Sequence, residues 1–429
     1  MKYGLIGEHL PHSFSKEIHA LCAPYEYGLC ELSRGEVGEF MERADFSAIN
    51  VTIPYKQTVM PYLYDIDAQA KRIGAVNTVV NRGGRLYGYN TDFYGMLSLI
   101  RRIGIEIKGK KVLILGTGGT AHTARAVVAY LEAAECITVS RRADPERGVI
   151  SYADAISSCG DAEVIFNTTP CGMFPNADGA EGMPAEPIDI SAFPSLCGVV
   201  DAVYNPLRTN LIVKARSRGI PAEGGLYMLV AQAVLASRVF LGEELERVAS
   251  DPETVKTIDK IYSEIEKQKE NIVLTGMPGS GKSTVGRRLA KRLGRPFVDT
   301  DELIVKRAGR PIPEIFAELG ESGFRDIESE AVREAANNLT GAVIATGGGA
   351  ILREQNVLAL RRSGRLYFLD RSLDALLPTA DRPLASSAEA IKKRYNERYE
   401  RYLATADKRI VIDEVIEHTV NTISEDFCK

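Results

Sequence analysis

The chain has 429 residues, a length that favours two or three domains over one small module. Its 53 Lys and Arg residues and 57 Asp and Glu residues give a net charge of −4 and a pI near 5.9, which argues against a protein that coats nucleic acid. Hydrophobic residues at 45% and charged residues at 26% match ordinary folded proteins and exclude global disorder.

Cysteine usage and the first residues both indicate a reducing compartment. Seven Cys are scattered without a CxxC pair or a Cys/His cluster at zinc-binding spacing. The first strand-like segment, residues 2–7, begins almost at the initiator Met and leaves no room for an export signal. The most apolar stretch, residues 226–241, is interrupted by Gln232 and Arg238 and is too short to span a bilayer. We therefore expect a cytoplasmic protein with neither a membrane nor a nucleic-acid partner.

Short apolar runs alternate with helix-length patterns along the chain. The upstream runs are residues 3–6, 48–53, 112–115, 137–139, 164–166 and 199–203, and the downstream runs are residues 272–275, 296–299, 342–346, 366–369 and 409–412. This alternation predicts an α/β fold with parallel sheets, and the downstream runs predict one compact five-stranded domain.

Three groups of polar residues stand near the expected strand ends of the first hundred residues. Residues 12–15 place two hydroxyls on alternate positions, and residues 50–56 end a strand in a turn stiffened by Pro54. Residues 74–78 and 88–92 add an amide and a carboxylate. Each segment by itself is more typical of a turn than of a site.

A glycine-rich turn follows the expected strand at residues 111–115. The pattern is GxGxxA between a strand and a helix, and its residues are Gly116, Thr117, Gly118, Gly119, Thr120 and Ala121. Glycines at these positions permit a tight turn, and the helix N-terminus offers N–H groups to a pyrophosphate. The next strand ends in Ser140, Arg141 and Arg142, where an NAD site would carry an acidic residue. Two guanidiniums suit a ribose 2′-phosphate, so the sequence favours NADP over NAD.

Together these segments resemble the shikimate dehydrogenase family over about residues 2–242. The resemblance implies an α/β substrate-binding domain at residues 1–92 and 225–245 and a Rossmann NADP-binding domain at residues 93–224. It implies a catalytic pair, Lys56 and Asp92, and substrate contacts from Ser13, Ser15, Thr52, Asn77, Tyr204 and Gln232. Gly225 is implied on the cofactor side. Lys16 and Ala20 depart from the family, which usually has Pro and Asn there.

The implied first reaction is the reduction of 3-dehydroshikimate to shikimate with NADPH. A hydride comes from the nicotinamide, and a Lys ammonium beside a carboxylate can supply the proton. An NAD-dependent quinate dehydrogenase is a second interpretation of the same residues.

The segment from residue 243 to residue 270 is unusually charged, with 14 of its 28 residues Asp, Glu, Lys or Arg. Val255, Ile258, Tyr262 and Ile265 recur at three- and four-residue spacing, which predicts an amphipathic helix. We assign residues 246–270 as a charged linker helix, and the last helix of the upstream domain is an equal alternative.

A second nucleotide motif follows directly. The expected strand at residues 272–275 runs into an intact GxxxxGK[ST] whose phosphate-binding residues are Gly276, Gly279, Ser280, Gly281, Lys282, Ser283 and Thr284. The loop amides cradle phosphates, Lys282 neutralises them and the Ser283 hydroxyl can ligate Mg²⁺. This pattern predicts an ATP-binding P-loop domain over residues 271–429, with the fold of the nucleoside-monophosphate kinases.

With the residues that follow, the downstream part resembles shikimate kinase over about residues 271–415. The motifs are Asp299-Thr300-Asp301, Phe324-Arg325, Thr346-Gly347-Gly348-Gly349-Ala350, Asp381-Arg382-Pro383-Leu384 and Arg398-Tyr399-Glu400-Arg401-Tyr402. The resemblance implies that Asp301, Arg325, Gly348 and Arg398 bind shikimate. It also implies that Asp299 assists Mg²⁺ and that Arg382 belongs to a lid, although residues 373–382 are fewer than a usual lid contains.

The sequence as a whole predicts a bifunctional enzyme that makes shikimate with NADPH and phosphorylates it with MgATP. A regulator that kept one half as a metabolite-binding module is the competing interpretation. Such a regulator would be expected to lose Lys56, Asp92, Lys282 or Asp301, and all four are present.

Overall fold

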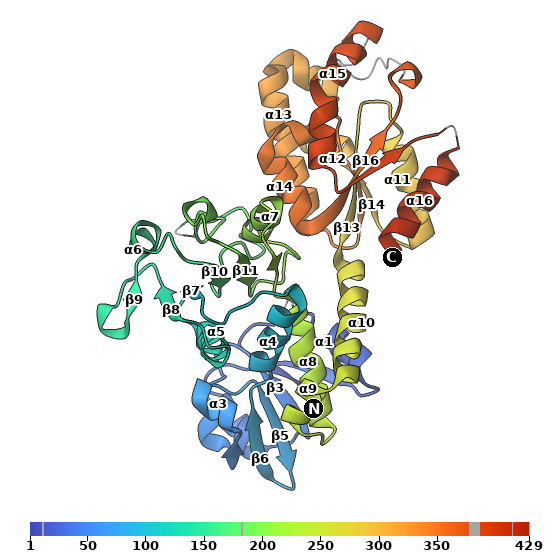
Figure 1. The fold of residues 1–429 in the computed structure, drawn as a ribbon. Helices are drawn as coiled ribbons and strands as arrows, with labels where there is room; N and C mark the ends of the chain where they lie inside the picture. Colours follow the sequence, from blue (N-terminus) through green and yellow to red (C-terminus); the bar gives the residue numbers. More distant parts are fainter. Residues whose placement is uncertain (11–12, 182, 377–386, 414, 429) are drawn as a thin grey trace. The chain divides into compact units, whose positions relative to one another are not determined.

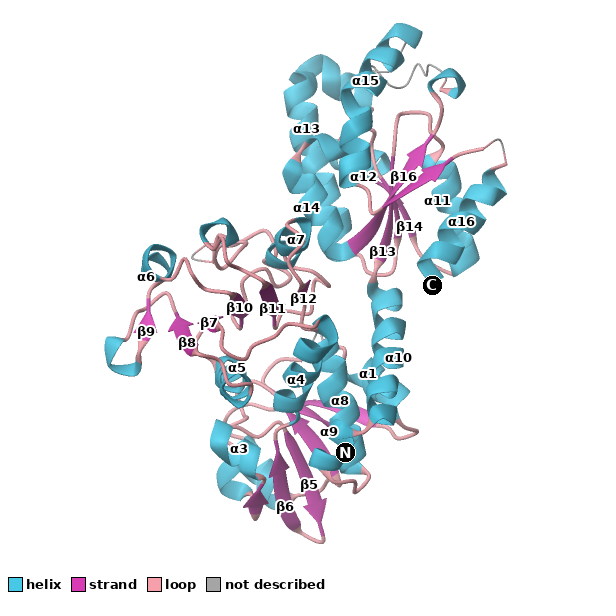
Figure 2. Cartoon of the chain, in the orientation of Figure 1, coloured by secondary structure: helices cyan, strands magenta, loops and turns pink. Residues whose placement is uncertain are grey.

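The computed structural model describes residues 1–10, 13–181, 183–376, 387–413 and 415–428 (Figure 1). Its contacts divide the chain into two compact units. The first unit comprises Met1–Asn205 and Lys214–Ile265, and the second comprises Pro206–Val213 and Glu266–Lys429. Within the described residues the first unit has two six-stranded sheets and the second has one five-stranded sheet, with helices packed around them (Figure 2).

The first sheet has the strand order β2-β1-β3-β5-β6-β4. Its strands are β1 (Tyr3–Gly7), β2 (Tyr27–Glu31), β3 (Ala48–Val51), β4 (Asp65–Ile66), β5 (Thr78–Arg82) and β6 (Arg85–Tyr89). β1, β2 and β3 pair in parallel, whereas β5 runs antiparallel to β3 and β6. The expectation of parallel sheets alone is wrong here, because Gly83 and Gly84 both have positive φ and fold β5 back onto β6 as a hairpin.

The helices that pack with this sheet come from both the start and the end of the first unit's sequence. They are α1 (Ser15–Cys22), α2 (Val37–Arg43), η1 (Met60–Tyr62), α3 (Ala68–Ile73), α4 (Thr91–Ile103), α8 (Leu226–Phe240), α9 (Leu245–Ser250) and α10 (Pro252–Lys269). α8 is apolar on nearly every side and packs against both α1 and α4. Residues from the start and the end of the first unit therefore share one core, in which Leu5 and Ala48 lie with Leu235 and Val239.

The charged segment after α8 is helical, and its apolar side is buried. Ile258, Ile261, Tyr262 and Ile265 of α10 lie inside the protein. The Tyr227 hydroxyl of α8 donates a hydrogen bond of 2.9 Å to Oδ1 of Asp259 on α10. This stretch of α10 packs as a terminal helix of the first unit would.

The second sheet of the first unit is parallel throughout, with the order β12-β11-β10-β7-β8-β9. Its strands are β7 (Lys111–Leu115), β8 (Glu135–Val139), β9 (Val149–Ile150), β10 (Val164–Asn167), β11 (Gly198–Asp201) and β12 (Ala222–Glu223). The connecting helices are α5 (Gly119–Tyr130), η2 (Pro145–Arg147), α6 (Tyr152–Ser158), η3 (Ile190–Ala192) and α7 (Asn210–Ser217). After β7 the chain pairs first with β8 on one side and later with β10 on the other, so a ligand-binding crevice is expected at the carboxyl end of β7.

The second unit has the order β14-β15-β13-β16-β17, parallel throughout, which confirms the predicted five-stranded domain. Its strands are β13 (Asn271–Thr275), β14 (Phe297–Asp299), β15 (Val343–Ala345), β16 (Gly364–Asp370) and β17 (Lys408–Val411). Its helices are α11 (Lys282–Leu293), α12 (Thr300–Ala308), α13 (Ile312–Asn338), η4 (Ala350–Leu352), α14 (Glu354–Ser363), η5 (Leu373–Ala375), α15 (Ala388–Thr405) and α16 (Ile416–Cys428). β13 is buried along its whole length, and α13 is interrupted at Gly320, whose φ is 67°.

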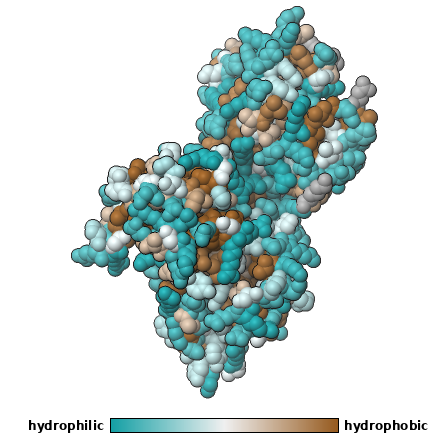
Figure 3. Space-filling model, in the orientation of Figure 1, coloured by the Kyte–Doolittle hydropathy of each residue, from teal (hydrophilic) through white to brown (hydrophobic). Residues whose placement is uncertain are grey.

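The face of the molecule drawn in Figure 3 is mostly hydrophilic, with smaller hydrophobic areas between the hydrophilic ones. Among the residues that the structure describes, no helix is both long enough and apolar enough to cross a membrane. All seven cysteines are free thiols.

Candidate active sites

Lys56 and Asp92 form an ion pair in the first unit. The Lys56 ammonium lies 2.6 Å from Oδ2 of Asp92, and the side chains are 22% and 12% exposed. Lys56 lies in the turn after β3. Asp92 lies in the first turn of α4, where Oδ1 of Asn90 caps the helix by accepting the Phe93 amide at 3.1 Å. The predicted catalytic pair is thus in contact and partly buried.

Asn77 connects this pair to α8. Its Oδ1 accepts the Thr91 amide at 2.7 Å, and its Nδ2 donates to Thr91 Oγ1 at 3.0 Å and to Gln232 Oε1 at 3.5 Å. The backbone also joins the two regions, because the Val76 amide donates to the Lys56 carbonyl. Thr91 was missed in the sequence, although it directly precedes Asp92, which was a usable signal.

The remaining predicted substrate contacts lie in two places. Ser13 Oγ accepts the Ser15 amide at 3.2 Å at the start of α1, and the Phe14 ring between them meets Tyr204 edge-on with centroids 5.3 Å apart. Burial raises the pKa of Tyr204. Thr52 stands directly after β3, where its amide donates to the Ile6 carbonyl at 3.0 Å. The structure therefore groups Ser13 and Ser15 with Tyr204, and it groups Asn77 and Gln232 with the Lys56 pair.

The glycine-rich turn after β7 has no room for a side chain at Gly116. Gly116 has φ 110°, and a Cβ there would lie 2.8 Å from Thr168 Oγ1. Gly118 precedes α5 without a side-chain cap, so Gly119, Thr120 and Ala121 begin a helix whose first amides can meet an anion. Gly225 is equally constrained, because a Cβ there would lie 2.2 Å from the Ala202 carbonyl oxygen.

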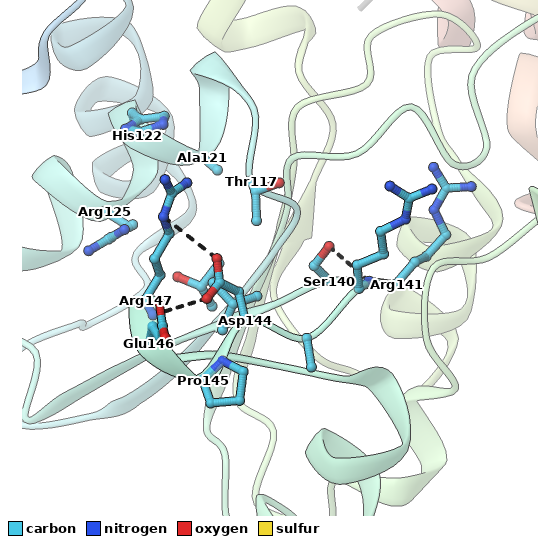
Figure 4. A pocket seen from close by; sticks show the side chains of 14 residues that line it. Thr117, Ala121, His122, Arg125, Ser140, Arg141, Asp144, Pro145, Glu146 and Arg147 are labelled. Atoms are coloured by element: carbon cyan, nitrogen blue, oxygen red, sulfur yellow. Dashed lines mark hydrogen bonds and ion pairs between the residues drawn. The ribbon is translucent and has the colours of Figure 1, made fainter.

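A cavity of about 1000 Å³ lies beside this turn (Figure 4). Ser140, Arg141 and Arg142, which the sequence places at the ribose phosphate, are among the residues that line it. The sequence interpretation missed three further basic lining residues, His122, Arg125 and Arg147, which come from α5 and the loop after β8. Asp144 and Glu146 are the acidic ones, and Asp144 forms an ion pair with Arg147 at 3.6 Å. A cavity with this excess of basic side chains fits the phosphorylated end of NADP.

The P-loop of the second unit has the geometry that its motif predicts. Gly276 has φ 148°, Gly279 has φ 79° and Gly281 has φ 93°, values that other residues rarely adopt. Lys282 opens α11, and its ammonium donates to the Gly276 and Met277 carbonyls at 2.8 and 2.9 Å. Ser280 lies within the loop, and Ser283 and Thr284 belong to the first turn of α11.

A hydroxyl and a carboxylate meet beside the P-loop. Ser283 Oγ donates to Asp299 Oδ2 at 2.6 Å, and Asp299 Oδ1 accepts the Asp301 amide at 2.9 Å. Oxygen ligands of this kind suit Mg²⁺, so Ser283 and Asp299 fit the predicted metal position.

Asp301, Arg325, Gly348 and Arg398 line one pocket together with Glu328 and Pro278. Arg398 is 2% exposed, and its Nη1 donates to the Gly348 carbonyl at 3.0 Å. Its Nε and Nη2 are buried and have no hydrogen-bond partner among the described residues, which indicates an anionic ligand. Burial lowers the pKa of Arg398. Arg382, the predicted lid residue, lies outside the described residues.

Glu328 was missed by the sequence interpretation. Its carboxylate accepts Arg325 Nη1 at 2.6 Å, three residues earlier on α13, while Glu321 accepts Nη2 at 3.1 Å. Burial raises the pKa of Glu328, with Asp301 contributing in the same direction against the opposing effect of Arg325. The spacing of three residues from Arg325 on a helix was the available signal.

Two family models match the chain. The shikimate dehydrogenase substrate binding domain matches residues 5–79, and shikimate kinase matches residues 278–427. Curated relatives match the first part: the chain is 35% identical over 283 residues to shikimate dehydrogenase (NADP(+)) from Clostridium perfringens, covering 61% of this chain and 97% of that protein. The protein of the same name from Clostridium beijerinckii is 36% identical over 256 residues, with 56% and 91% covered.

Solved structures agree over the same region. A chorismate mutase/shikimate 5-dehydrogenase fusion protein from Clostridium acetobutylicum has a TM-score of 0.55 at 32% identity, covering 62% of this chain and 97% of that one. Shikimate dehydrogenase 1 from Peptoclostridium difficile has a TM-score of 0.53 at 31% identity, with 62% and 98% covered. Shikimate 5-dehydrogenase from Thermus thermophilus, solved with NADP(H) and shikimate, has a TM-score of 0.51 at 26% identity, with 61% and 99% covered.

Proposed function

Because the chain belongs to the shikimate dehydrogenase family and continues into a shikimate kinase domain, we propose that it catalyses two consecutive reactions. The first unit reduces 3-dehydroshikimate to shikimate with NADPH, and the second phosphorylates the 3-hydroxyl of shikimate with MgATP. The observation that carries this proposal is the presence of two separate reactive clusters in one chain: the Lys56–Asp92 pair, and Asp301 beside the buried Arg398.

In the first reaction NADPH supplies a hydride to the ring ketone. The developing alkoxide then needs a proton, which the Lys56 ammonium can donate, and Asp92 at 2.6 Å holds that ammonium in place. Asn77 fixes Thr91, and through it the start of α4, so Asp92 keeps its direction. We assign Ser13, Ser15, Thr52, Tyr204 and Gln232 to the binding of the substrate's carboxylate and hydroxyls.

Arg141 and Arg142 select the cofactor. They replace the acidic residue that binds the ribose hydroxyls of NAD, and they line a cavity with His122, Arg125 and Arg147. The 2′-phosphate of NADP would have charge-assisted hydrogen bonds there, whereas NAD would present only a hydroxyl.

In the second reaction ATP supplies the phosphoryl group. Lys282 and the P-loop amides hold its phosphates, and Ser283 with Asp299 would hold Mg²⁺. Asp301 orients the attacking hydroxyl and receives its proton. Arg325, Arg398 and the Gly348 amide hold the carboxylate, and Arg382 is assigned to the cover over the triphosphate. Positioning and charge stabilisation are the main requirements of phosphoryl transfer.

Each domain is assigned one step. Residues 1–92 and 225–245 bind the shikimate skeleton, residues 93–224 bind NADP, residues 246–270 form the connecting helical segment, and residues 271–429 form the kinase. We place the protein in the cytoplasm, a reducing compartment that suits its seven free thiols and supplies both nucleotides. Its partners are small molecules, and the net charge of −4 favours neither nucleic acids nor anionic membranes.

One assay matrix tests the proposal. The full chain is incubated with 3-dehydroshikimate or quinate, each with both oxidation states of NADP and NAD, and separately with shikimate and MgATP. We expect 3-dehydroshikimate with NADPH to be the best pair and shikimate to yield shikimate 3-phosphate. A preference for quinate with NAD would show that the first unit is a quinate dehydrogenase. Failure of either reaction in folded protein would support the interpretation that one half is a metabolite-binding module of a regulator.

A further inference from the structure

Tyr402 contacts the backbone of residues 346–350 in the second unit, a segment that we call the glycine loop. Its hydroxyl donates a hydrogen bond of 2.5 Å to the Gly348 carbonyl, which also accepts Arg398 Nη1 at 3.0 Å. Both donors come from α15, four residues apart, so they lie on one face of the helix. The Tyr402 ring is 1% exposed and stacks on Phe368 with centroids 4.9 Å apart.

The Gly348 carbonyl belongs to the peptide that joins two glycines. A glycine peptide has wide conformational freedom, and a peptide group is planar, so fixing the Gly348 carbonyl also fixes the direction of the Gly349 N–H. The peptide before it, which carries the Gly348 N–H, is held separately, because the Ala350 amide donates to the Gly347 carbonyl at 3.2 Å. One peptide earlier, the Gly347 amide donates to Thr300 Oγ1 at 2.9 Å. Tyr402 therefore contributes to one of two anchors that set the Gly348 backbone.

Tyr402 also affects Arg398. The guanidinium donates one nitrogen to the Gly348 carbonyl and keeps Nε and Nη2 without a partner among the described residues. Without the Tyr402 hydroxyl, Arg398 would be the remaining side-chain donor to that carbonyl and would be drawn toward it. The guanidinium would then be less well placed for a ligand carboxylate.

We propose that Tyr402 is a positioning residue for the acceptor carboxylate: its hydroxyl fixes the Gly348 carbonyl and thereby holds both the glycine loop and Arg398 in their binding orientation. Tyr402 touches neither nucleotide nor acceptor in this assignment. The inference rests on the proposed function for the identity of the acceptor, shikimate.

The test compares Tyr402→Phe with Tyr399→Phe in the full chain. Tyr399 lies on the same helix, and its hydroxyl donates to Asp370 Oδ2 at 3.1 Å instead of to the loop, so it provides a matched hydroxyl deletion. Both variants keep the aromatic ring. For Tyr402→Phe we expect about a tenfold rise in the KM for shikimate, an unchanged KM for ATP and a kcat within a factor of about three. Tyr399→Phe should leave the KM for shikimate unchanged.

Two further measurements separate the possible failures. The dehydrogenase rate of the same preparation reports the amount of chain with a folded first unit, and thermal unfolding of the second unit reports structural damage there. A lower unfolding temperature with an unchanged KM for shikimate would overturn the inference, as would equal effects of the two variants. If the unaltered chain did not phosphorylate shikimate at all, the proposed function would have failed first.

Discussion

The two active sites differ in whether their charged side chains already have partners within the protein. In the first unit the Lys56 ammonium lies 2.6 Å from Asp92, and Asn77 is hydrogen-bonded to both Thr91 and Gln232. In the second unit the buried guanidinium of Arg398 has two nitrogens without a partner among the described residues. A proton donor needs a fixed direction before the substrate arrives, whereas an anion receptor gains affinity from a cation that is not yet neutralised.

The largest expected effect tests whether the two sites act independently. Lys56→Ala removes the proton donor and should reduce ketone reduction by at least about a thousandfold while leaving phosphorylation unchanged. Lys282→Ala should have the reverse effect, because the phosphates lose their buried cation. Both rates are measured on each full-length variant. Loss of both activities in a folded variant would contradict two independent sites.

Removal of the Arg398 guanidinium should lower the activity of the second unit without lowering its stability. Arg398→Met should lower kcat/KM for shikimate about a hundredfold, because the acceptor carboxylate loses a charge-assisted bond. The unfolding temperature of the second unit should stay the same or rise, since an incompletely paired buried charge is replaced by an apolar chain. Lys56→Met is the matched change in the first unit and should lower stability, because Asp92 loses its partner. A large fall in stability for Arg398→Met would contradict the contrast between the sites.

The cofactor cavity offers a third test. Replacing Arg141 and Arg142 by Asp and Ile should raise the KM for NADPH about thirty- to a hundredfold and leave NADH nearly unaffected, a difference of about 2 to 3 kcal/mol. Arg43→Ala is the control, because Arg43 is exposed, pairs with Glu39 at 3.1 Å and is not among the residues that line the cavity. Steady-state kinetics with both cofactors measures the effect, and equal losses for NADPH and NADH would refute the assignment.

The buried His19 gives the first unit a pH dependence of its own. Burial lowers its pKa to about 3, and its ring stacks on Tyr27 while Nδ1 contacts the Tyr25 hydroxyl at 2.7 Å. An unfolded His takes up a proton below about pH 6.5, and the folded one does not until much lower pH, so stability present near neutral pH is lost as pH falls. Between pH 6.5 and 5 the loss from this residue should be about 2 kcal/mol.

Urea unfolding at several pH values, followed by dehydrogenase activity, measures this loss. His19→Phe keeps an aromatic ring for stacking. It should reduce the slope of the unfolding free energy against pH, below pH 6.5, by the amount that corresponds to about one proton. An unchanged slope would show that His19 does not contribute.

The smallest expected effect concerns α10. Asp259 accepts hydrogen bonds from Tyr227 at 2.9 Å and Arg102 at 3.1 Å, but the Arg102 and Asp259 side chains are 36% and 47% exposed. Asp259→Ala should therefore lower the stability of the first unit by about 1 kcal/mol without changing either KM. Glu253→Ala, which removes an ion pair with Lys256 whose side chains are 71% and 72% exposed, should change nothing measurable. Thermal unfolding of both variants provides the comparison.

Periodicity and motif spacing predicted the strands that carry nucleotide loops. β7 and β13 are short, wholly apolar in their centres and followed by glycines whose conformations few other residues tolerate, so both signals are local. The sequence interpretation missed the hairpin of β5 and β6, although Gly83 and Gly84 mark its turn. It treated the polar residues on either side, 74–78 and 88–92, as parts of a site and not as the ends of two paired strands. Strand direction depends on such turns and not on apolar content.

The site residues that escaped sequence reasoning share one property: their roles depend on contacts between distant segments. Glu328 matters because it meets Arg325 inside a pocket, and Arg125 because α5 faces the loop after β8. Neither carries a motif of its own. Tyr402 belongs to one of the motifs that resemble shikimate kinase, but spacing alone does not predict its hydrogen bond to a carbonyl 54 residues away.

The bonds from the Lys282 ammonium to the Gly276 and Met277 carbonyls close the P-loop on itself. When a nucleotide binds, the Lys282 ammonium would exchange these two carbonyls for phosphate oxygens. The loop would need little further ordering, because it is already held in place. Affinity for a triphosphate should therefore depend on how readily the phosphates replace those two carbonyls around a cation that is only 5% exposed. The shikimate carboxylate meets a guanidinium that is 2% exposed. Because dissolved salt screens buried charges weakly, rising ionic strength should weaken the binding of ATP and of shikimate to a similar, small extent.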